Sequence, residues 1–234
     1  MKLMGIVENV RVIQERIAAA CERAGRQASE VTLMAVSKGH TPESIREAAD
    51  AGLTVFGENK IQELKLKRSQ CPGHFQWDFI GHLQTNKCRD AVYLSRMVQS
   101  VDSLRVAEAL QVACEKLAKT LPVLLEVNVS GEATKYGFSP TEVLERLLEL
   151  NDYDRLEIHG FMCMAPWSKE PEKARPYFRR LKELQQEAEE ILGAPLPELS
   201  MGMSGDFEIA IEEGSTLVRV GTTLFGERKR KTST

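Results

Sequence analysis

The sequence lacks the long apolar segments that would place a protein in a membrane or direct it out of the cell. None of its apolar runs approaches the ~20 consecutive residues that a membrane-spanning helix needs. From Met1 to Ile17 apolar side chains alternate with Lys, Glu, Arg and Gln, whereas a signal peptide has a continuous apolar stretch. We therefore expect no membrane contact and a cytoplasmic location.

Cysteines and histidines spaced for a disulfide framework or a metal site are also missing. The five cysteines are odd in number and scattered, and none forms a CxxC pair. His40, His74 and His159 form no pair at metal-ligand spacing. These patterns argue against a disulfide-stabilised scaffold and a zinc site, and they favour a reducing compartment.

The chain has no excess of charge of one sign. Its 31 Lys and Arg residues against 34 Asp and Glu give a net charge of -3, so nothing draws it to nucleic acid or acidic lipid. The basic run at 228–231 is confined to the tail, residues 227–234, which we expect to be solvated and disordered. The hydrophobic share of 42% over 234 residues is enough for one large folded core.

What the chain does have is a regular alternation of short β-rich runs and longer amphipathic ones. An N-terminal helix is predicted over residues 5–24, where apolar residues recur at spacings of three and four before Gly25. The predicted strands are 31–36, 54–56, 77–80, 97–101, 122–127, 156–164, 198–203 and 217–220. The main helices predicted between them cover 41–52, a segment ending near 68, 84–91, 104–119, 140–150 and 172–192.

Eight strands alternating with helices indicate an α/β protein, a single (β/α)8 TIM barrel with an additional N-terminal helix. A doubly wound open sheet would show a similar alternation. No linker or break in composition interrupts residues 1–226, so we expect them to form one barrel domain.

Active sites of such barrels lie where the strands end, which draws attention to Lys38 after the first strand. Thr32, Met34, Val36 and Lys38 share parity, so an extended strand directs all four to the same side. If the odd-numbered residues face the helices, Lys38 points into the barrel mouth. There it is either a solvated loop residue or an amine held for imine or phosphate chemistry, and burial would favour the neutral, nucleophilic amine.

Two glycine-containing turns follow the last two strands. Ser204-Gly205 ends strand seven and Gly221-Thr222 ends strand eight. Glycine permits close backbone approach to an anion, and these two loops form the recurrent phosphate site of TIM barrels. The pairs therefore predict a phosphate cradle, with two ordinary tight turns as the alternative.

Several other polar or sulfur-containing residues fall near the expected site. Arg219 interrupts an apolar strand and needs a partner, either a strand-end carboxylate or a ring nitrogen of a ligand. His82 either stacks on a cofactor, caps the next helix or is solvated, and Asn59 either faces the site or only organises its turn. Met162 and Met164 are assigned to barrel filling, and Met201 and Met203 lie close enough to the cradle to touch a ligand.

Five motifs in order along the chain together point to one family. They are AVSK at 35–38, FGENKIQE at 56–63, FIGHLQTNK at 79–87, SMGMS at 200–204, and VRVGT at 218–222 with FG at 225–226. One such motif would be weak, but the five cover nearly the whole chain. The sequence closely resembles the pyridoxal phosphate (PLP) homeostasis proteins, a family similar in fold to the N-terminal barrel of alanine racemase.

The resemblance, and not the residue spacing, identifies the ligand as PLP. It implies that Lys38 holds PLP covalently as an internal aldimine and that Arg219 meets the pyridine nitrogen. The residues that would hold the phosphate are Ser204, Gly221 and Thr222. Those that would line the ring are Asn59, His82 and Met201. Two positions depart from the family pattern: Gly205 replaces a polar residue, which could change the grip on the phosphate, and His40 stands where Thr or Lys is common.

The choice between an enzyme and a carrier depends on the electronics of the cofactor. An arginine at the pyridine nitrogen favours the unprotonated ring, a weak electron sink. Racemisation also needs a second proton carrier, which in alanine racemases comes from a C-terminal domain and a partner subunit, as the resemblance implies. This chain ends shortly after strand eight, and among its four tyrosines only Tyr136 is near a strand end.

We therefore expect a monomeric PLP-binding homeostasis protein that passes PLP to apoenzymes without substantial turnover. The alternatives are a racemase-like PLP enzyme and a Schiff-base aldolase that uses Lys38 on a phosphorylated sugar. A second imine site at Lys60, Lys87 or Lys135 is a further hypothesis.

Overall fold

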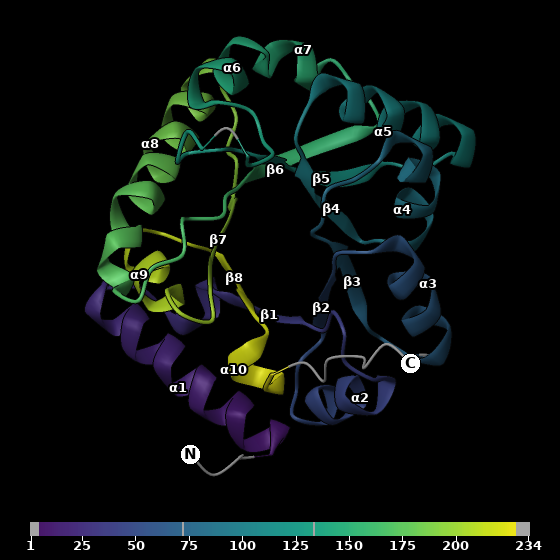
Figure 1. Ribbon diagram of the computed structural model, residues 1–234. Helices are drawn as coiled ribbons and strands as arrows, with labels where there is room; N and C mark the ends of the chain where they lie inside the picture. The colour runs from purple at the N-terminus through teal and green to yellow at the C-terminus, as the bar shows by residue number, and fades with distance from the viewer. Residues whose placement is uncertain (1–4, 72, 133, 228–234) are drawn as a thin grey trace.

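Eight short strands pair in parallel in sequence order, and the last pairs with the first, so the sheet closes into a barrel (Figure 1). The computed structural model describes residues 5–71, 73–132 and 134–227. The strands are β1 (Thr32–Val36), β2 (Val55–Glu58), β3 (Gln76–Phe79), β4 (Met97–Val101), β5 (Leu121–Glu126), β6 (Leu156–Met162), β7 (Glu198–Met203) and β8 (Leu217–Val220). The predicted TIM barrel is confirmed, and the open sheet is excluded.

Helices surround the barrel on its outer side (Figure 1). They are α1 (Ile6–Arg23), α2 (Pro42–Asp50), α3 (Ile61–Gln70), α4 (Cys88–Leu94), α5 (Leu104–Leu117), α6 (Pro140–Glu145), α7 (Leu147–Asn151), α8 (Arg175–Leu192), α9 (Phe207–Glu212) and α10 (Thr222–Phe225). Short 3-10 helices cover Ala28–Glu30, Thr85–Lys87 and Pro171–Ala174. Within the described part of the chain, no helix has the length and apolar character needed to span a membrane.

The differences from the predicted elements are local. The helix predicted over 140–150 is divided at Arg146, which ends α6 and begins α7. Strand β6 ends at Met162, and Met164, beyond it, is 40% exposed, so only Met162 fills the barrel as predicted. Helix α10 was not predicted. The predicted disordered tail lies, from residue 228 on, outside the described residues.

The barrel interior contains two small apolar layers. Met34 packs there with Val55 and Leu217, whereas the neighbouring Ala35 belongs to the core between strands and helices. This alternation confirms the predicted parity of β1. The second layer contains Met97, Leu124 and Met162.

A chain of buried hydrogen bonds crosses the interior between these layers. Arg96 Nε and Nη2 donate to the two carboxylate oxygens of Asp78 at 2.8 and 2.6 Å, and Gln99 Nε2 donates to Asp78 at 2.7 Å. Ser200 Oγ donates to Gln99 Oε1 at 2.7 Å and accepts from Arg219 Nη1 at 2.6 Å. Burial raises the pKa of Asp78, and the contact with Arg96 opposes that rise. The chain links strands β3, β4, β7 and β8 through polar groups that are satisfied by one another.

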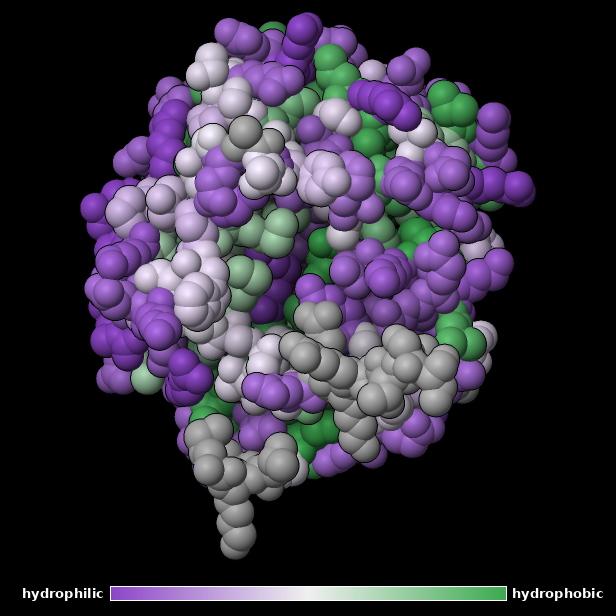
Figure 2. Space-filling view, in the orientation of Figure 1, coloured by the Kyte–Doolittle hydropathy of each residue, from purple (hydrophilic) through white to green (hydrophobic). Residues whose placement is uncertain are grey.

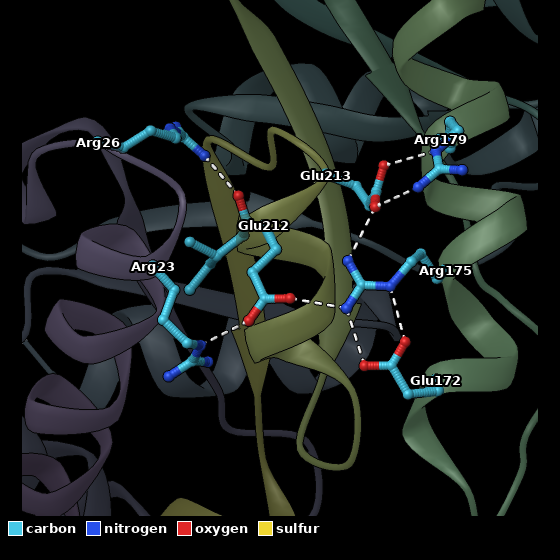
Figure 3. Close-up of polar contacts among 8 residues, drawn as sticks. Arg23, Arg26, Glu172, Arg175, Arg179, Glu212 and Glu213 are labelled. Atoms are coloured by element: carbon cyan, nitrogen blue, oxygen red, sulfur yellow. Dashed lines mark hydrogen bonds and ion pairs between the residues drawn. The ribbon is translucent and has the colours of Figure 1, made fainter.

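An ion-pair network fixes α9, the helix that follows β7 (Figure 3). Arg175 of α8 contacts Glu172 through two bonds of 2.7 and 2.8 Å, and it also reaches Glu212 at 2.7 Å and Glu213 at 2.9 Å. Arg179, one turn further along α8, donates to both carboxylate oxygens of Glu213 at 3.1 and 3.0 Å. The C-terminal end of α9 is thus tied to α8 by several bonds that share partners.

The N-terminal helix α1 holds α9 and α10 from the other side. Its contacts are those of Arg16 with Glu208, Arg23 with Glu212, and Asn9 with the carbonyl oxygen of Leu224. Arg26, in the turn after α1, donates to the carbonyl oxygens of Ile211 and Ser215. A helix outside the eight-fold repeat therefore fixes the two short helices that follow β7 and β8.

Arg175→Met is expected to lower the free energy of unfolding by about 1–2 kcal/mol, because it leaves the adjacent Glu212 and Glu213 without their shared cation. Urea denaturation at low salt measures this loss. Arg180→Met, on the same helix but with exposed partners, is the control and should change the value by less than about 0.5 kcal/mol. Equal losses in the two variants would show that the network adds no stability.

Candidate functional site

A cavity of about 440 Å³ opens at the carboxyl ends of the strands. Figure 2, in the orientation of Figure 1, shows a hollow near the centre of the barrel. The residues predicted from sequence that line this cavity are Lys38, Ser204, Arg219, Gly221 and Thr222. Residues from β1, β7 and β8 thus meet in one space, although they are separated by more than half of the chain.

The loops after β7 and β8 are joined to each other at Ser204. Its Oγ accepts from the backbone N–H of Gly221 at 3.3 Å and of Thr223 at 3.4 Å. A Cβ at Gly221 would lie 3.3 Å from the carbonyl oxygen of Val36, which explains why this crossing of β8 with β1 favours glycine. Gly205 has open space beside it, so its backbone is accessible to a ligand. Hydroxyl and backbone N–H groups therefore gather here, as a bound phosphate would require.

The backbone before Lys38 is held from behind by a buried lysine of α3. Lys67 is 3% exposed, and its Nζ donates to the carbonyl oxygen of Ser37 at 2.6 Å. The same ammonium group contacts Glu58 Oε1 at 2.7 Å and Glu63 Oε1 at 2.6 Å. One cation thus connects the end of β1 with β2 and α3.

Glu58 and Glu63, the two carboxylates that Lys67 contacts, also accept hydrogen bonds from the residues on either side of Lys38. Ser37 Oγ donates to Glu58 Oε1 at 2.6 Å, and the backbone N–H of Gly39 donates to Glu63 Oε1 at 2.5 Å. Burial raises the pKa of Glu58 despite the nearby ammonium group. Burial also acts to raise the pKa of Glu63, but hydrogen bonds outweigh it and lower the value. With both neighbours fixed, the Lys38 side chain is presented to the cavity.

Arg219 is buried in the cavity floor and is satisfied by neutral acceptors. Its Nη1 donates to the carbonyl oxygen and Oγ of Ser200 at 2.7 and 2.6 Å, and its Nη2 donates to the carbonyl oxygen of Cys163 at 2.8 Å. Among the described residues no carboxylate forms an ion pair with it, although Glu126 and Asp206 act electrostatically to raise its pKa against the lowering effect of burial. Three of its five N–H groups are used, and the other two have no acceptor among the described residues.

The structure places His82 and Asn59 outside the set that lines the cavity. His82 Nδ1 lies 2.7 Å from Asp102 Oδ2, and the His82 ring stacks on Tyr136 with centroids 3.8 Å apart. Asn59 lies in a tight crossing, because a Cβ at Gly81 would come within 2.3 Å of its carbonyl oxygen. Both predicted ligand contacts stay predictions.

Of the two methionines of β7 that were predicted to touch a ligand, Met203 lines the cavity, as Met162 and Met164 do, whereas Met201 is fully buried in the core. The pairing of β7 with β8 shifts between Ser200 and Met203, and Gly202 adopts a φ of 90° within that shift. Such an irregularity changes which side successive residues face. Strict alternation along β7 could not have revealed this change.

Glu126 and the Lys67 cluster, which is Lys67 with its partners Glu58, Glu63 and Ser37, were not identified from sequence. Glu126 lies on β5 and is 4% exposed, and its carboxylate interrupts an apolar run just as Arg219 does on β8. That interruption is the signal that could have found it. For Lys67 the only local signal is the i,i+4 spacing from Glu63, which is typical of ordinary exposed helix pairs.

Known proteins are similar to this chain over nearly its whole length. The family model described as alanine racemase, N-terminal domain, matches residues 9–229. A protein from Aquifex aeolicus named pyridoxal phosphate homeostasis protein is 43% identical over 227 residues, which cover 97% of this chain and 100% of the relative.

Solved structures agree with the fold. PipY of Synechococcus elongatus with PLP bound has 34% identity and a TM-score of 0.80, with 92% of this chain and 100% of that chain covered. An alanine racemase of Clostridium difficile has 15% identity and a TM-score of 0.75, with 97% of this chain and 59% of that chain covered. The second likeness concerns the fold alone.

Lys67→Met is expected to destabilise the protein by about 3–5 kcal/mol, because it leaves buried Glu58 without its cation. The loss should be larger at pH 8 than at pH 5. A buried carboxyl whose pKa is raised on folding contributes stability at low pH that is lost as the pH rises through its folded pKa. Urea denaturation at both pH values measures this, with exposed Lys65→Met as the control. A loss independent of pH would contradict the assigned role of Glu58.

Proposed function

This chain belongs to the pyridoxal phosphate homeostasis protein family, and from that premise we propose that it binds PLP covalently at Lys38 and holds it for hand-over to apoenzymes. The observation that carries the proposal is the single cavity that joins Lys38 to Arg219 and to the Ser204 and Gly221 loops. A lysine amine, a buried cation and a group of phosphate-binding donors are what this cofactor requires. The PLP-bound structure of PipY, a 34% identical neighbour, supports the same ligand here.

The residues present fit the chemical groups of PLP. Ser204, Gly221 and Thr222 would bind the phosphate through hydroxyl and backbone N–H groups, and Gly205 leaves room for it. PLP supplies an aldehyde, which condenses with an amine to form an imine and release water. Lys38 is the amine on the cavity wall, and the Lys67 cluster fixes the backbone on which it stands.

Arg219 supports a carrier rather than an enzyme. Its remaining N–H groups would donate to the pyridine nitrogen, and an arginine there keeps that nitrogen unprotonated. A ring in this state withdraws electrons weakly from a substrate carbon. The homeostasis name of the 43% identical Aquifex relative agrees with this interpretation.

Further residues are proposed to contact the PLP ring. Asn59 and His82 remain proposed ring contacts because they follow β2 and β3, whose carboxyl ends border the barrel mouth. Met201 also remains a proposed ring contact, and Met203, which lines the cavity, is proposed beside it. We further propose that the protein acts as a monomer in the cytoplasm and that residues 1–226 form the binding unit.

Addition of PLP to the purified protein should produce a visible absorption band that is removed by borohydride reduction. Lys38→Ala should abolish the band without changing the urea unfolding transition, because the amine is lost and the fold is kept. Lys60→Ala, which removes an exposed lysine after β2, should keep the band. The same band and affinity in Lys38→Ala would place the imine on another residue.

The carrier proposal also predicts the absence of enzymatic turnover. Racemase, decarboxylase and transaminase assays on a panel of amino acids should show no rate near the ~1 s⁻¹ or faster that enzymes typically reach. Racemisation at such a rate would favour the alternative, a racemase-like PLP enzyme.

A further inference from the structure

Glu126 directs its carboxylate into the barrel at the level of the cavity. It is the last residue of β5 and pairs with Met162, which lines the cavity. Leu124, two residues earlier, packs inside the barrel with Met162, whereas Leu125 belongs to the outer core. Because successive residues of a strand face opposite sides, Glu126 shares the inward side with Leu124.

This carboxylate has no protein partner in the described part of the chain. The residue is 4% exposed, and none of the hydrogen bonds or ion pairs of the described residues involves its oxygen atoms. Burial raises the pKa of Glu126 to about 7, the nearby Asp102 acts in the same direction, and Arg219 opposes them. Glu126 is not one of the residues that line the cavity, but its strand partner Met162 is, so a nearly buried carboxyl group without a protein partner at this position suggests a ligand.

The groups around Glu126 make the position attractive to a cation. Asp102 directly follows β4, its side chain is 5% exposed, and its Oδ2 is hydrogen-bonded to His82. Burial raises the pKa of the thiol of Cys163, the residue after β6, to about 12, so the thiol is neutral at physiological pH. Arg219, the cation across the barrel on β8, donates to Ser200 and Cys163 instead of to Glu126. Two carboxyl groups therefore lie near each other with a single charged guanidinium opposing them.

We propose that Glu126 and Asp102 form a subsite for a primary ammonium group, which belongs to the acceptor amine that takes PLP from Lys38. This inference rests on the proposed function and names the chemical class of its acceptor. An ammonium ion matches the carboxylates in charge and supplies the hydrogen-bond donors that Glu126 lacks. Amino acids and the lysine side chains of apoenzymes both present such a group.

Glu126 also has the proton affinity that amine exchange requires. An ammonium ion cannot attack a carbon atom, so the incoming group must first lose a proton, and the Glu126 carboxylate accepts it. With PLP bound, the neutral nitrogen would take over both bonds from the imine carbon to Lys38, and its two remaining protons would pass to the Lys38 nitrogen. Glu126 would return the first proton to that nitrogen, so Lys38 would leave as an ammonium group, one imine would replace another, and nothing would be oxidised or reduced.

The first test uses the apoprotein and n-butylammonium as the probe, with binding measured by calorimetry at pH 8. Glu126→Gln keeps the shape of the side chain but removes its charge, so it should weaken binding by about 10-fold or more. Glu132→Gln, which neutralises an exposed carboxylate in the loop after β5, should bind as the wild type does. Equal affinity in Glu126→Gln and the wild type would overturn the proposal.

The second test measures release of bound PLP to n-butylamine by the change in visible absorption. Glu126→Gln should slow release by about 10-fold or more while the affinity for PLP stays within about twofold. The wild-type rate should rise with pH through about 7, where Glu126 titrates beside Asp102, Arg219 and the neutral Cys163, and the variant should lose this step. An unchanged rate or pH profile in the variant would contradict the subsite.

The two tests separate this inference from the proposed function. If the wild type takes up no PLP, the proposed function fails, and calorimetry on the apoprotein still decides whether the ammonium subsite exists. If PLP binds at Lys38 and Glu126→Gln behaves as the wild type in both tests, the subsite alone is wrong.

Discussion

A charged guanidinium buried inside the barrel constrains much of the structure around it. Arg219 is almost fully buried, so its donors need acceptors that the strands themselves supply. Ser200 and Cys163 provide them, and Ser200 is in turn bonded to Gln99 and through it to Asp78. Loss of one member would leave a buried polar group unsatisfied, so the strands that carry this chain hold one another in place.

The same constraint organises the candidate site from two directions. On one side, the bonds from Arg219 on β8 to Ser200 on β7 join the two strands whose ends carry Gly221 and Ser204, and α1 and α8 hold the helices that follow. On the other side, Lys67 fixes the backbone around Lys38. Both ends of the expected ligand thus meet groups that are already ordered, which limits the entropy lost on binding.

Sequence reasoning recovered the barrel and most of its mouth because both depend on local periodicity. The alternation of strands and helices predicted the closed sheet, and the parity of β1 correctly placed Met34 inside and Lys38 at the cavity. Both Met201 and Met203 were predicted near the cradle, but the sequence could not tell which of them lines the cavity, because that depends on an irregular residue, Gly202, inside a strand. The burial of Lys67 depends on contacts between elements distant in sequence, which no local pattern reports.

The covalent attachment of PLP to Lys38 is the central claim, and peptide mapping tests it most directly. Wild-type protein loaded with PLP is reduced with borohydride and digested, and mass spectrometry locates the modified lysine. The account predicts the adduct on Lys38. An adduct found on Lys60, Lys87 or Lys135, with none on Lys38, would contradict it.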